Sequence, residues 1–281
     1  MNTVAGCAAG LLLVMFATGT AHCAESRCNA GPHDAAAKNA VSLETLRWAP
    51  FRRPELGWAT YAPLIAKEIG VSCPPDSPAF AQGLAAWQKK HHAPATGVMD
   101  PATFRTMEQN WELARPFVMA SRHICPPPPD ETTLVKAVPG ESYGGKQIML
   151  QRGALEAYRR LVMAARAELP TLSSDPLLLR IFSGYRGPDA DDARCRRDNN
   201  CHGVVRAICS AHRTGMAMDL YLGAAPGSRP DSSDDSNRRY LTHTPVYLWL
   251  VRNASRFGFV NYPFEPWHWE WTGGTANKPQ P

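Results

Sequence analysis

The 281-residue sequence has no long run of like charge. Its 30 Lys and Arg residues outnumber the 25 Asp and Glu residues, which leaves a net charge of +5, but the basic residues are scattered along the chain. Nowhere do they alternate with aromatic residues as in a nucleic-acid groove. We therefore expect no nucleic-acid partner, whereas a mild positive field suits another anionic polymer.

Long hydrophobic runs are also missing beyond the first residues. The apolar run at 8–18 is too short to span a bilayer and is followed by small residues, so we predict a signal peptide at 1–24, cleaved after Ala21 or Ala24. A buried N-terminal helix is the alternative, because no Lys or Arg precedes the run. Cys23 raises the alternative of a lipoprotein, although His22 stands where a small residue is usual. The mature chain is expected to have no transmembrane span and to be exported, periplasmic or associated with the cell envelope.

The cysteines include no C-x-x-C pair, which argues against a structural zinc site. Of the eight cysteines, Cys7 and Cys23 lie in the predicted signal region, and six remain: Cys28, Cys73, Cys125, Cys195, Cys201 and Cys209. An even number in an exported chain predicts disulfides, and the short 195–201 loop suggests Cys195 with Cys201 first. The rival interpretation is a metal site built from Cys195, Cys201, His202 and Cys209.

No regular alternation of strands and helices runs through the C-terminal part. Periodicity predicts an amphipathic helix at 151–169, strands at 177–183 and 216–222, a helix at 245–257 and a strand region at 259–271. The polar run at 231–237 is expected to be a solvated loop. This mixture favours an α+β fold over a doubly wound α/β fold.

Proline and glycine divide the chain into segments. We expect an N-terminal segment at 25–54 that acts as a tether or entry segment, a helical domain at 55–120, a Pro-rich linker at 121–144, a catalytic domain at 145–273 and a tail at 274–281. Apolar spacing predicts helices at 61–69 and 78–90, and Asp100 followed by Pro101 predicts the capped start of a third. Four consecutive prolines at 126–129 predict a stiff extended spacer.

The segment 80–107 resembles the small three-helix peptidoglycan-binding domain found beside many wall hydrolases. The resemblance rests on Trp87-Gln88, Gly97, Asp100 and Thr103, and it implies that this domain contacts cell-wall glycan. An insertion around Cys73 departs from the family's short form. The alternative is a helical bundle that only packs on the catalytic domain.

The candidate catalytic and metal-binding residues are concentrated in two short segments of the sequence. Segment 210–219 carries His212 and Asp219 seven residues apart with a Gly between them, and segment 265–268 places Glu265 three residues before His268. Two imidazoles and a carboxylate are a usual catalytic zinc set that leaves one position open. Zinc activates a water, and Glu265 would act as its general base.

These strings resemble the zinc D-alanyl-D-alanine carboxypeptidase family, which includes the D,D-peptidases of vancomycin resistance, over about 145–273. The resemblance implies Zn²⁺ ligands at His212, Asp219 and His268, catalysis by Glu265, and stabilisation of charge on the scissile carbonyl by Arg186 of the string Ser183-Gly184-Tyr185-Arg186. Substrate binding is assigned to Tyr185, Ser210 and Trp267, with Trp267 interpreted as packing or a pocket wall. The implied substrate is the peptidoglycan stem peptide.

Three functions remain open from the sequence. The leading hypothesis is a D,D-carboxypeptidase that removes the terminal D-Ala. The second is an endopeptidase that cuts cross-links or an L,D bond, since the insertion at 194–209 adjoins the site and departs from the family pattern. The third is a non-catalytic wall-binding protein, against which the presence of Glu265 speaks.

Overall fold

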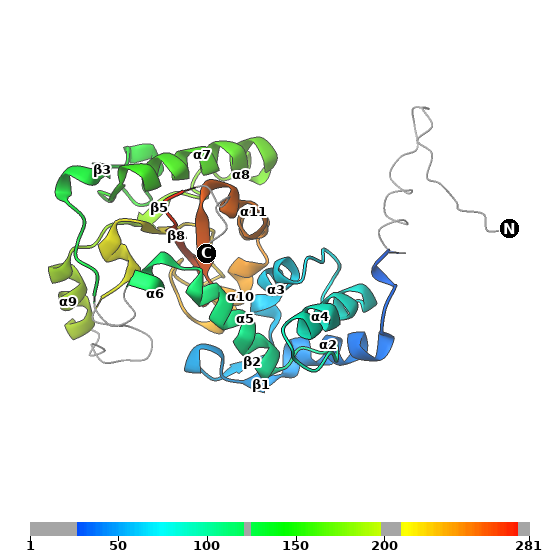
Figure 1. The fold of residues 1–281 in the computed structure, drawn as a ribbon. Coiled ribbons are helices and arrows are strands. Elements are labelled where there is room, and N and C mark those ends of the chain that lie inside the picture. The colour runs from blue at the N-terminus through cyan, green and yellow to red at the C-terminus, as the bar shows by residue number, and fades with distance from the viewer. Residues whose placement is uncertain (1–26, 121–124, 198–208, 275–281) are drawn as a thin grey trace, which may run out of the picture.

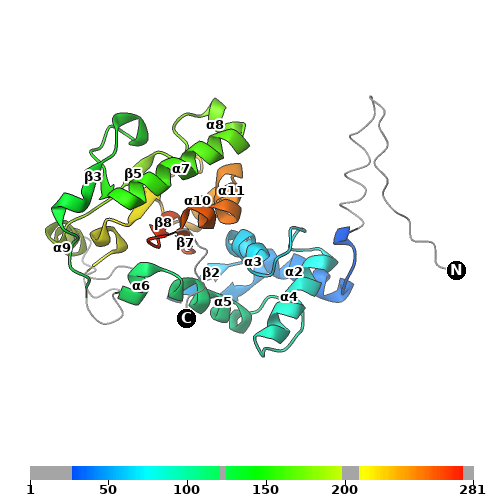
Figure 2. The same ribbon diagram turned by 45° about the horizontal axis from the view of Figure 1, so that its top comes forward.

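The computed structural model describes residues 27–120, 125–197 and 209–274. The predicted signal peptide, with Cys7 and Cys23, lies outside these ranges, as does most of the C-terminal tail. Figures 1 and 2 show two units in contact. We call residues 27–120 the helical unit and residues 134–197 and 209–274 the sheet unit.

The helical unit contains four main helices around one apolar core. They are α2 (His33–Thr45), α3 (Ala62–Glu68), α4 (Pro78–Lys90) and α5 (Pro101–Leu113), and a short hairpin of β1 (Arg47–Trp48) and β2 (Glu55–Leu56) lies between the first two. The helix predicted at 78–90 is confirmed, and so is the third helix start, where the Asp100 side chain accepts a hydrogen bond from the Thr103 N–H. Residues buried in this core include Trp58, Ile65, Phe80, Leu84 and Phe104.

Three of the residues that carried the resemblance to a wall-binding domain, Gln88, Gly97 and Thr103, form one hydrogen-bond network. The Gln88 amide donates to the Val98 carbonyl and to Thr103 Oγ1, each at 3.0 Å, and accepts from the Gly97 N–H at 2.8 Å. Gly97 has φ +69°, and a Cβ there would lie 2.6 Å from the Ala81 carbonyl oxygen, so the turn requires glycine. This network fastens the turn before α5 to α4. The stability of the fold is therefore enough to account for these residue types, without a role in binding.

The N-terminal segment differs from the expected tether. Its residues form α2, and Asn39 on that helix is fully buried. The Asn39 side chain donates to the Gly97 carbonyl and accepts from the Met99 N–H, both at 2.9 Å. A disulfide joins Cys28 to Cys73. Because a buried amide and a covalent bond fasten this segment to the later helices, it belongs to the helical unit.

The sheet unit is built on a four-stranded antiparallel sheet of order β5-β6-β8-β7. The strands are β5 (Ile181–Ser183), β6 (Ala217–Leu220), β7 (Phe259–Tyr262) and β8 (Glu265–Trp271). Helices α7 (Arg152–Glu168) and α11 (Pro245–Asn253) share one apolar core with the sheet, and the shorter helices of this unit are α8 (Thr171–Ser174), α9 (Pro188–Arg197) and α10 (Asp235–Thr242). The short helix α6 (Pro116–Ala120) ends the helical unit. The mixture of helices and small antiparallel sheets fits the predicted α+β class.

The strand period of two separates the sheet into an apolar and a polar face. Met218, Leu220, Trp267 and Trp269 all belong to the core shared with α7 and α11. The residues that alternate with them, Asp219 on β6 and His268 and Glu270 on β8, therefore point to the opposite face. Helices α7 and α11 cover the apolar face, so Asp219, His268 and Glu270 lie together on the other face of the sheet.

The predicted linker is partly absorbed into the sheet unit. Its proline run lies outside helices and strands, as predicted, but β3 (Leu134–Lys136) follows and pairs with β4 (Met149–Gln151). A second disulfide joins Cys125 to Cys209, just before Ser210. Cys195 is disulfide-bonded as well, but Cys201 lies outside the described residues, so the Cys195–Cys201 pairing stays a prediction.

The prediction of a solvated loop at 231–237 is wrong for the second half of this segment. Residues from Asp235 on begin α10, and Asn237 is fully buried. Its side chain accepts from the Ala225 N–H and donates to the Ser232 carbonyl, each at 2.9 Å. The acidic residues and serines of this segment suggested solvent exposure. The Asn237 side-chain amide is nevertheless buried, because it provides hydrogen-bond partners to backbone groups of the loop.

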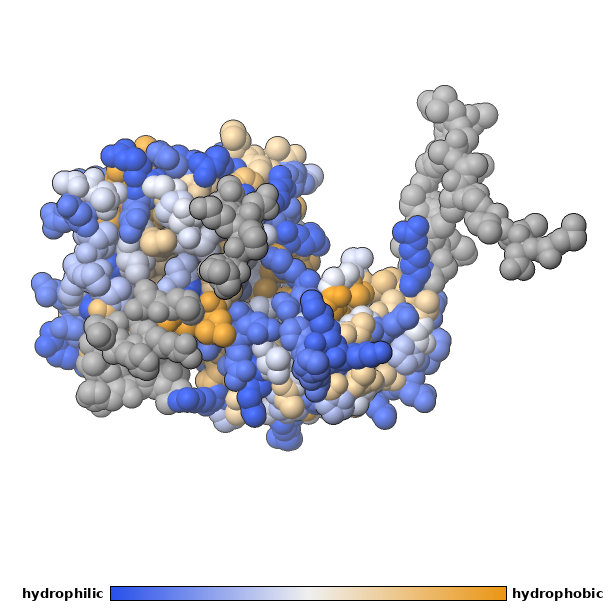
Figure 3. Space-filling model, in the orientation of Figure 1, coloured by the Kyte–Doolittle hydropathy of each residue, from blue (hydrophilic) through white to orange (hydrophobic). Residues whose placement is uncertain are grey.

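The outer surface is mostly hydrophilic on the face shown in Figure 3. Large exposed apolar side chains are spread over both units, as Val41, Leu56, Val138 and Met163 illustrate. Among the described residues, no helix combines the length and apolar character needed to cross a membrane.

Candidate metal centre

Strand register brings Asp219 and His268 together. They are direct partners in the antiparallel pair of β6 and β8, although 49 residues separate them in the chain. Paired residues on one face have Cβ atoms about 5 Å apart, within reach of a common ion. The Asp219 Oδ1 atom lies 2.9 Å from His268 Nδ1.

His212 joins them from the turn that leads into β6. It lies in a 3₁₀ helix (Ala211–Thr214) that ends at Gly215, whose φ of +67° reverses the chain direction. His212 Nε2 is 3.3 Å from Asp219 Oδ2. One donor atom from each of His212, Asp219 and His268 lies within 4.8 Å of the other two, and all three residues are buried. The structure thus brings the three predicted ligands together.

Hydrogen bonds behind the two rings orient their nitrogens. His212 Nδ1 is 2.8 Å from the Gly184 carbonyl, which can only accept, so this nitrogen carries the hydrogen and Nε2 keeps a lone pair. On the other side, His268 Nε2 is 3.2 Å from Glu270 Oε1, and a hydrogen on Nε2 leaves Nδ1 with a lone pair. Both lone pairs then face Asp219. Such outer hydrogen bonds are what metal-binding histidines require.

Charge at the centre favours a cation. Burial opposes ionisation of Asp219, but the two imidazoles outweigh it and hold its pKa below the usual range. Burial lowers the pKa of His268, yet hydrogen bonds to Asp219 and Glu270 reverse this and raise it to about 10. The carboxylates that attract a proton to His268 also attract a divalent ion.

The donor set and its spacing fit zinc. Zinc takes imidazole nitrogen and carboxylate oxygen ligands at about 2.0–2.2 Å in tetrahedral geometry, which separates neighbouring donors by roughly 3.4 Å. His268 Nδ1 lies 2.9 Å from Asp219 Oδ1 and His212 Nε2 lies 3.3 Å from Asp219 Oδ2, so each imidazole nitrogen is within this separation of one oxygen of the carboxylate. Three ligands leave one position open for a water or a substrate oxygen.

Glu265 lies beside the three ligands at the start of β8. Its Oε2 atom is 4.0 Å from His268 Nδ1, and its side chain is 32% exposed while the ligands are buried. Burial of the rest of the side chain raises the pKa of Glu265. A carboxylate so placed can accept a proton from a group bound at the centre and reach solvent.

Arg186 and Ser210 are held next to His212 by Asp191. The Arg186 N–H donates to the His212 carbonyl at 3.2 Å, and its guanidinium lies 3.1 Å from Asp191 Oδ1 and donates to Ser210 Oγ at 3.2 Å. Ser210 Oγ donates to Asp191 Oδ1 at 3.0 Å, and Arg213 donates to the same carboxylate at 3.3 Å. Asp191 thus holds two guanidinium groups, those of Arg186 and Arg213, in one cluster with Ser210.

Two other residues assigned to substrate binding lie differently. Tyr185 is half-buried, and its N–H donates to the Met149 carbonyl at 2.7 Å. Trp267 is 3% exposed and lies in the apolar core, on the face of the sheet opposite the ligands. Its position matches packing, the first of the two interpretations given to it.

Three residues that contribute to the site were not assigned from the sequence: Asp191, Glu270 and Arg115. Glu270 could have been found, since it follows His268 by two residues in a strand and must share its face. Asp191 lies five residues after Arg186 in α9, but nothing in the sequence pairs the two. Arg115 lies in the other unit, and its sequence context gives no signal.

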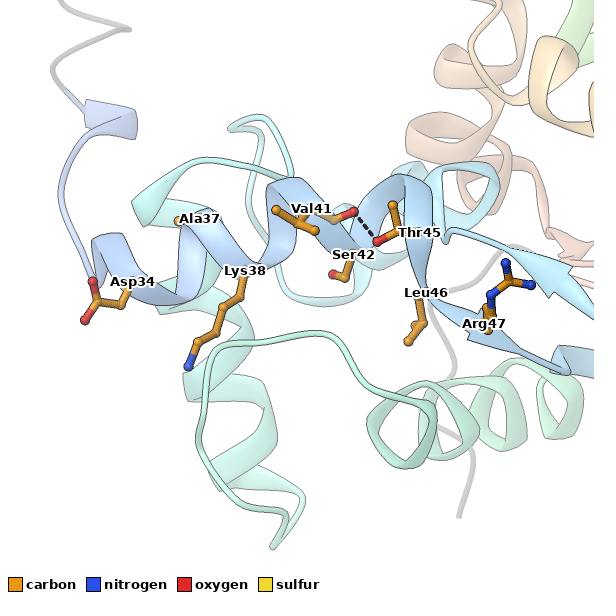
Figure 4. A pocket seen from close by; sticks show the side chains of 8 residues that line it. All are labelled: Asp34, Ala37, Lys38, Val41, Ser42, Thr45, Leu46 and Arg47. Carbon is orange, nitrogen blue, oxygen red and sulfur yellow. Dashed lines mark hydrogen bonds between the residues drawn. The ribbon is translucent and has the colours of Figure 1, made fainter.

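A pocket elsewhere takes no part in this chemistry. It lies along α2 in the helical unit and is lined by Asp34, Ala37, Lys38, Val41, Ser42, Thr45, Leu46 and Arg47 (Figure 4). The hydrogen bond drawn there, from Thr45 Oγ1 to the Val41 carbonyl, belongs to the helix itself. Its lining residues offer no clustered metal ligands.

Comparisons with known proteins give weak structural similarities. No protein-family model matches the sequence, and no curated protein matches it. Among solved structures, 53% of the chain aligns with 71% of the LdcB LD-carboxypeptidase, from a study of peptidoglycan recognition, at 20% identity and a TM-score of 0.39. A second solved structure is a VanY D,D-pentapeptidase in complex with Zn(II). Here 52% of the chain aligns with 82% of that protein, at 20% identity and a TM-score of 0.30.

Proposed function

We propose that this chain is an exported zinc peptidase that hydrolyses the terminal D-Ala-D-Ala bond of peptidoglycan stem peptides. The observation that carries the proposal is the convergence of His212, Asp219 and His268, with donor atoms within 4.8 Å of one another and the Glu265 carboxylate beside them. The D,D assignment rests on the resemblance of segments 183–186, 210–219 and 265–268 to the zinc carboxypeptidase family.

His212, Asp219 and His268 would hold the ion through Nε2, a carboxylate oxygen and Nδ1. When bound, zinc would lower the pKa of a water to about 7 and polarise a carbonyl. Glu265 accepts the proton as the water attacks the peptide carbonyl and then donates it to the leaving amine. Its raised pKa suits both steps, because a carboxyl group whose pKa lies closer to neutrality both takes up and releases a proton readily.

Arg186 supplies positive charge beside the reacting carbonyl. Asp191 and Ser210 hold its guanidinium, so little reorganisation accompanies the development of negative charge on the substrate oxygen. Asp191 also pairs with Arg213, which offsets the cost of keeping this carboxylate buried.

Export is supported by the disulfides Cys28–Cys73 and Cys125–Cys209, which form and persist in oxidising compartments. A periplasmic or envelope location agrees with a wall substrate. Contact of the helical unit with glycan belongs to the same proposal and is tested by co-sedimentation with insoluble peptidoglycan.

The test is HPLC of muropeptides after incubation with the purified, zinc-loaded protein. Released D-Ala with a shortened stem peptide is the expected product. New fragments from cleaved cross-links or an L,D bond would instead identify an endopeptidase. Unchanged muropeptides, with one zinc bound per chain, would identify a non-catalytic binder and contradict the proposed reaction.

A further inference from the structure

Glu270, the carboxylate behind His268, is held from the other unit of the molecule. The Glu270 side chain is 2% exposed, and its Oε1 atom lies 3.2 Å from His268 Nε2. Arg115 donates from Nε to this same oxygen at 2.7 Å, and the Phe117 N–H donates to Glu270 Oε2 at 3.2 Å. Both donors belong to the helical unit.

Arg115 is fixed for this contact by its place after α5. The helix ends at Leu113, and the Arg115 N–H closes the last turn on the Glu112 carbonyl at 3.1 Å. Its guanidinium then lies 4.0 Å from the centre of the Tyr262 ring, at the end of β7. The Arg115 side chain is only 8% exposed, so it is buried against the sheet unit.

A second buried cation anchors the same region from the opposite direction. Arg238 of α10 is fully buried and donates to Glu55 and Tyr61 of the helical unit and to the Phe264 carbonyl, at 2.7, 2.6 and 2.8 Å. Phe51 of the helical unit adds ring contacts to Tyr262 and Phe264. The β7–β8 turn, which leads into Glu265, is thus enclosed by the helical unit.

We infer that the helical unit completes the metal centre, with Arg115 as a positioning residue that orients His268 through Glu270. The inference rests on the metal site of the proposed function and deepens it. A buried carboxylate needs a charged partner, and the Arg115 guanidinium pairs with Glu270 Oε1. Without it, Glu270 loses the group that directs Oε1 at His268, and the ring loses its fixed orientation.

The inference assigns the helical unit a role besides wall binding. A wall-binding module attached by a linker can move or be removed without effect on the metal. A unit that supplies Arg115 and the Phe117 N–H cannot be moved or removed without effect on the metal, because its loss changes the hydrogen bonds that orient His268 through Glu270. Loss of such outer contacts usually weakens metal binding by about 10–100-fold.

The test is zinc affinity, measured by chelator competition on the full chain with Arg115→Gln, Arg115→Lys and wild type. Gln removes the charge, so we expect the zinc dissociation constant to rise about tenfold, the lower end of this range because Arg115 acts through Glu270. Lys keeps the charge and should restore part of the affinity. The visible spectrum of the Co²⁺-substituted protein should change in Arg115→Gln, because it reports the geometry of the bound nitrogens.

Arg105→Gln is the matched control, since Arg105 is exposed on α5. Thermal unfolding establishes that each variant is folded. If Arg115→Gln is not, Glu270→Gln takes its place, because it removes the charge that Arg115 pairs with. Zinc affinity equal to that of Arg105→Gln in a folded variant overturns the inference and leaves the proposed function standing. A wild-type chain that binds no zinc overturns both.

Discussion

At the residue scale, hydrogen bonds behind each side chain decide what that side chain can do. His212 and His268 have the same ring, yet His212 presents Nε2 to the centre and His268 presents Nδ1. The difference follows from what stands behind them, a backbone carbonyl for one and Glu270 for the other. Histidine chemistry at this site is therefore set by two acceptors, Gly184 and Glu270, and not by the imidazoles alone.

Glu265→Gln tests the proton transfer at this scale. The amide cannot accept the proton, so kcat should fall by roughly 10²–10⁴-fold. The side chain is not one of the three ligands, so zinc content should stay at one ion per chain. Peptide turnover and elemental analysis measure the two quantities.

The control is Glu156→Gln, at an exposed position on α7. It should keep full activity. Turnover by Glu265→Gln at the wild-type rate would remove Glu265 from the mechanism and leave the metal site unaffected.

At the element scale, local signals in the sequence set the ends of several helices. Asp100 caps α5 and Ser77 caps α4, each through a side-chain oxygen that accepts from an N–H three residues on. Pro at the first helical position follows both caps. These are short-range effects, so they hold whatever the rest of the chain does.

Asp100→Ala should lower the free energy of unfolding by about 1 kcal/mol, because the Thr103 N–H loses its acceptor. Urea denaturation measures the change. Asp76→Ala serves as the control, since Asp76 is exposed and makes no hydrogen bond among the described residues. An equal loss in both variants would show that the cap contributes nothing specific.

At the scale of the whole molecule, the two units form one structure around the metal centre. The helical unit contacts the sheet unit through Arg115, Arg238 and Phe51, and the ligands come from a turn and two strands of the sheet unit. Zinc bound at such a centre stabilises the folded state only, since the ligands are dispersed when the chain unfolds.

Chelation of zinc should therefore lower the melting temperature of the full chain. At zinc concentrations about 100 times the dissociation constant, the bound ion adds about 2.7 kcal/mol to the free energy of unfolding. Differential scanning calorimetry with and without chelator measures the shift. The variant Asp219→Ala lacks a ligand and should melt at a temperature that the chelator changes little.

Local sequence information determined several helices of this protein and the residue types of its candidate site. Asp100-Pro101 and the 78–90 periodicity specify helix boundaries because caps and apolar stripes act within a few residues. His212, Asp219, His268 and Glu265 could be named as candidates because their chemistry is a property of the side chains themselves.

Tertiary structure alone decided which of these groups meet and what surrounds them. The register of β6 against β8 places Asp219 beside His268, and a shift by one residue would turn one of them to the apolar face. The contact of Arg115 with Glu270, 155 residues away, depends on the docking of two units and leaves no local pattern. Pairings across such distances result from the packing of the whole chain, which no short stretch of sequence records.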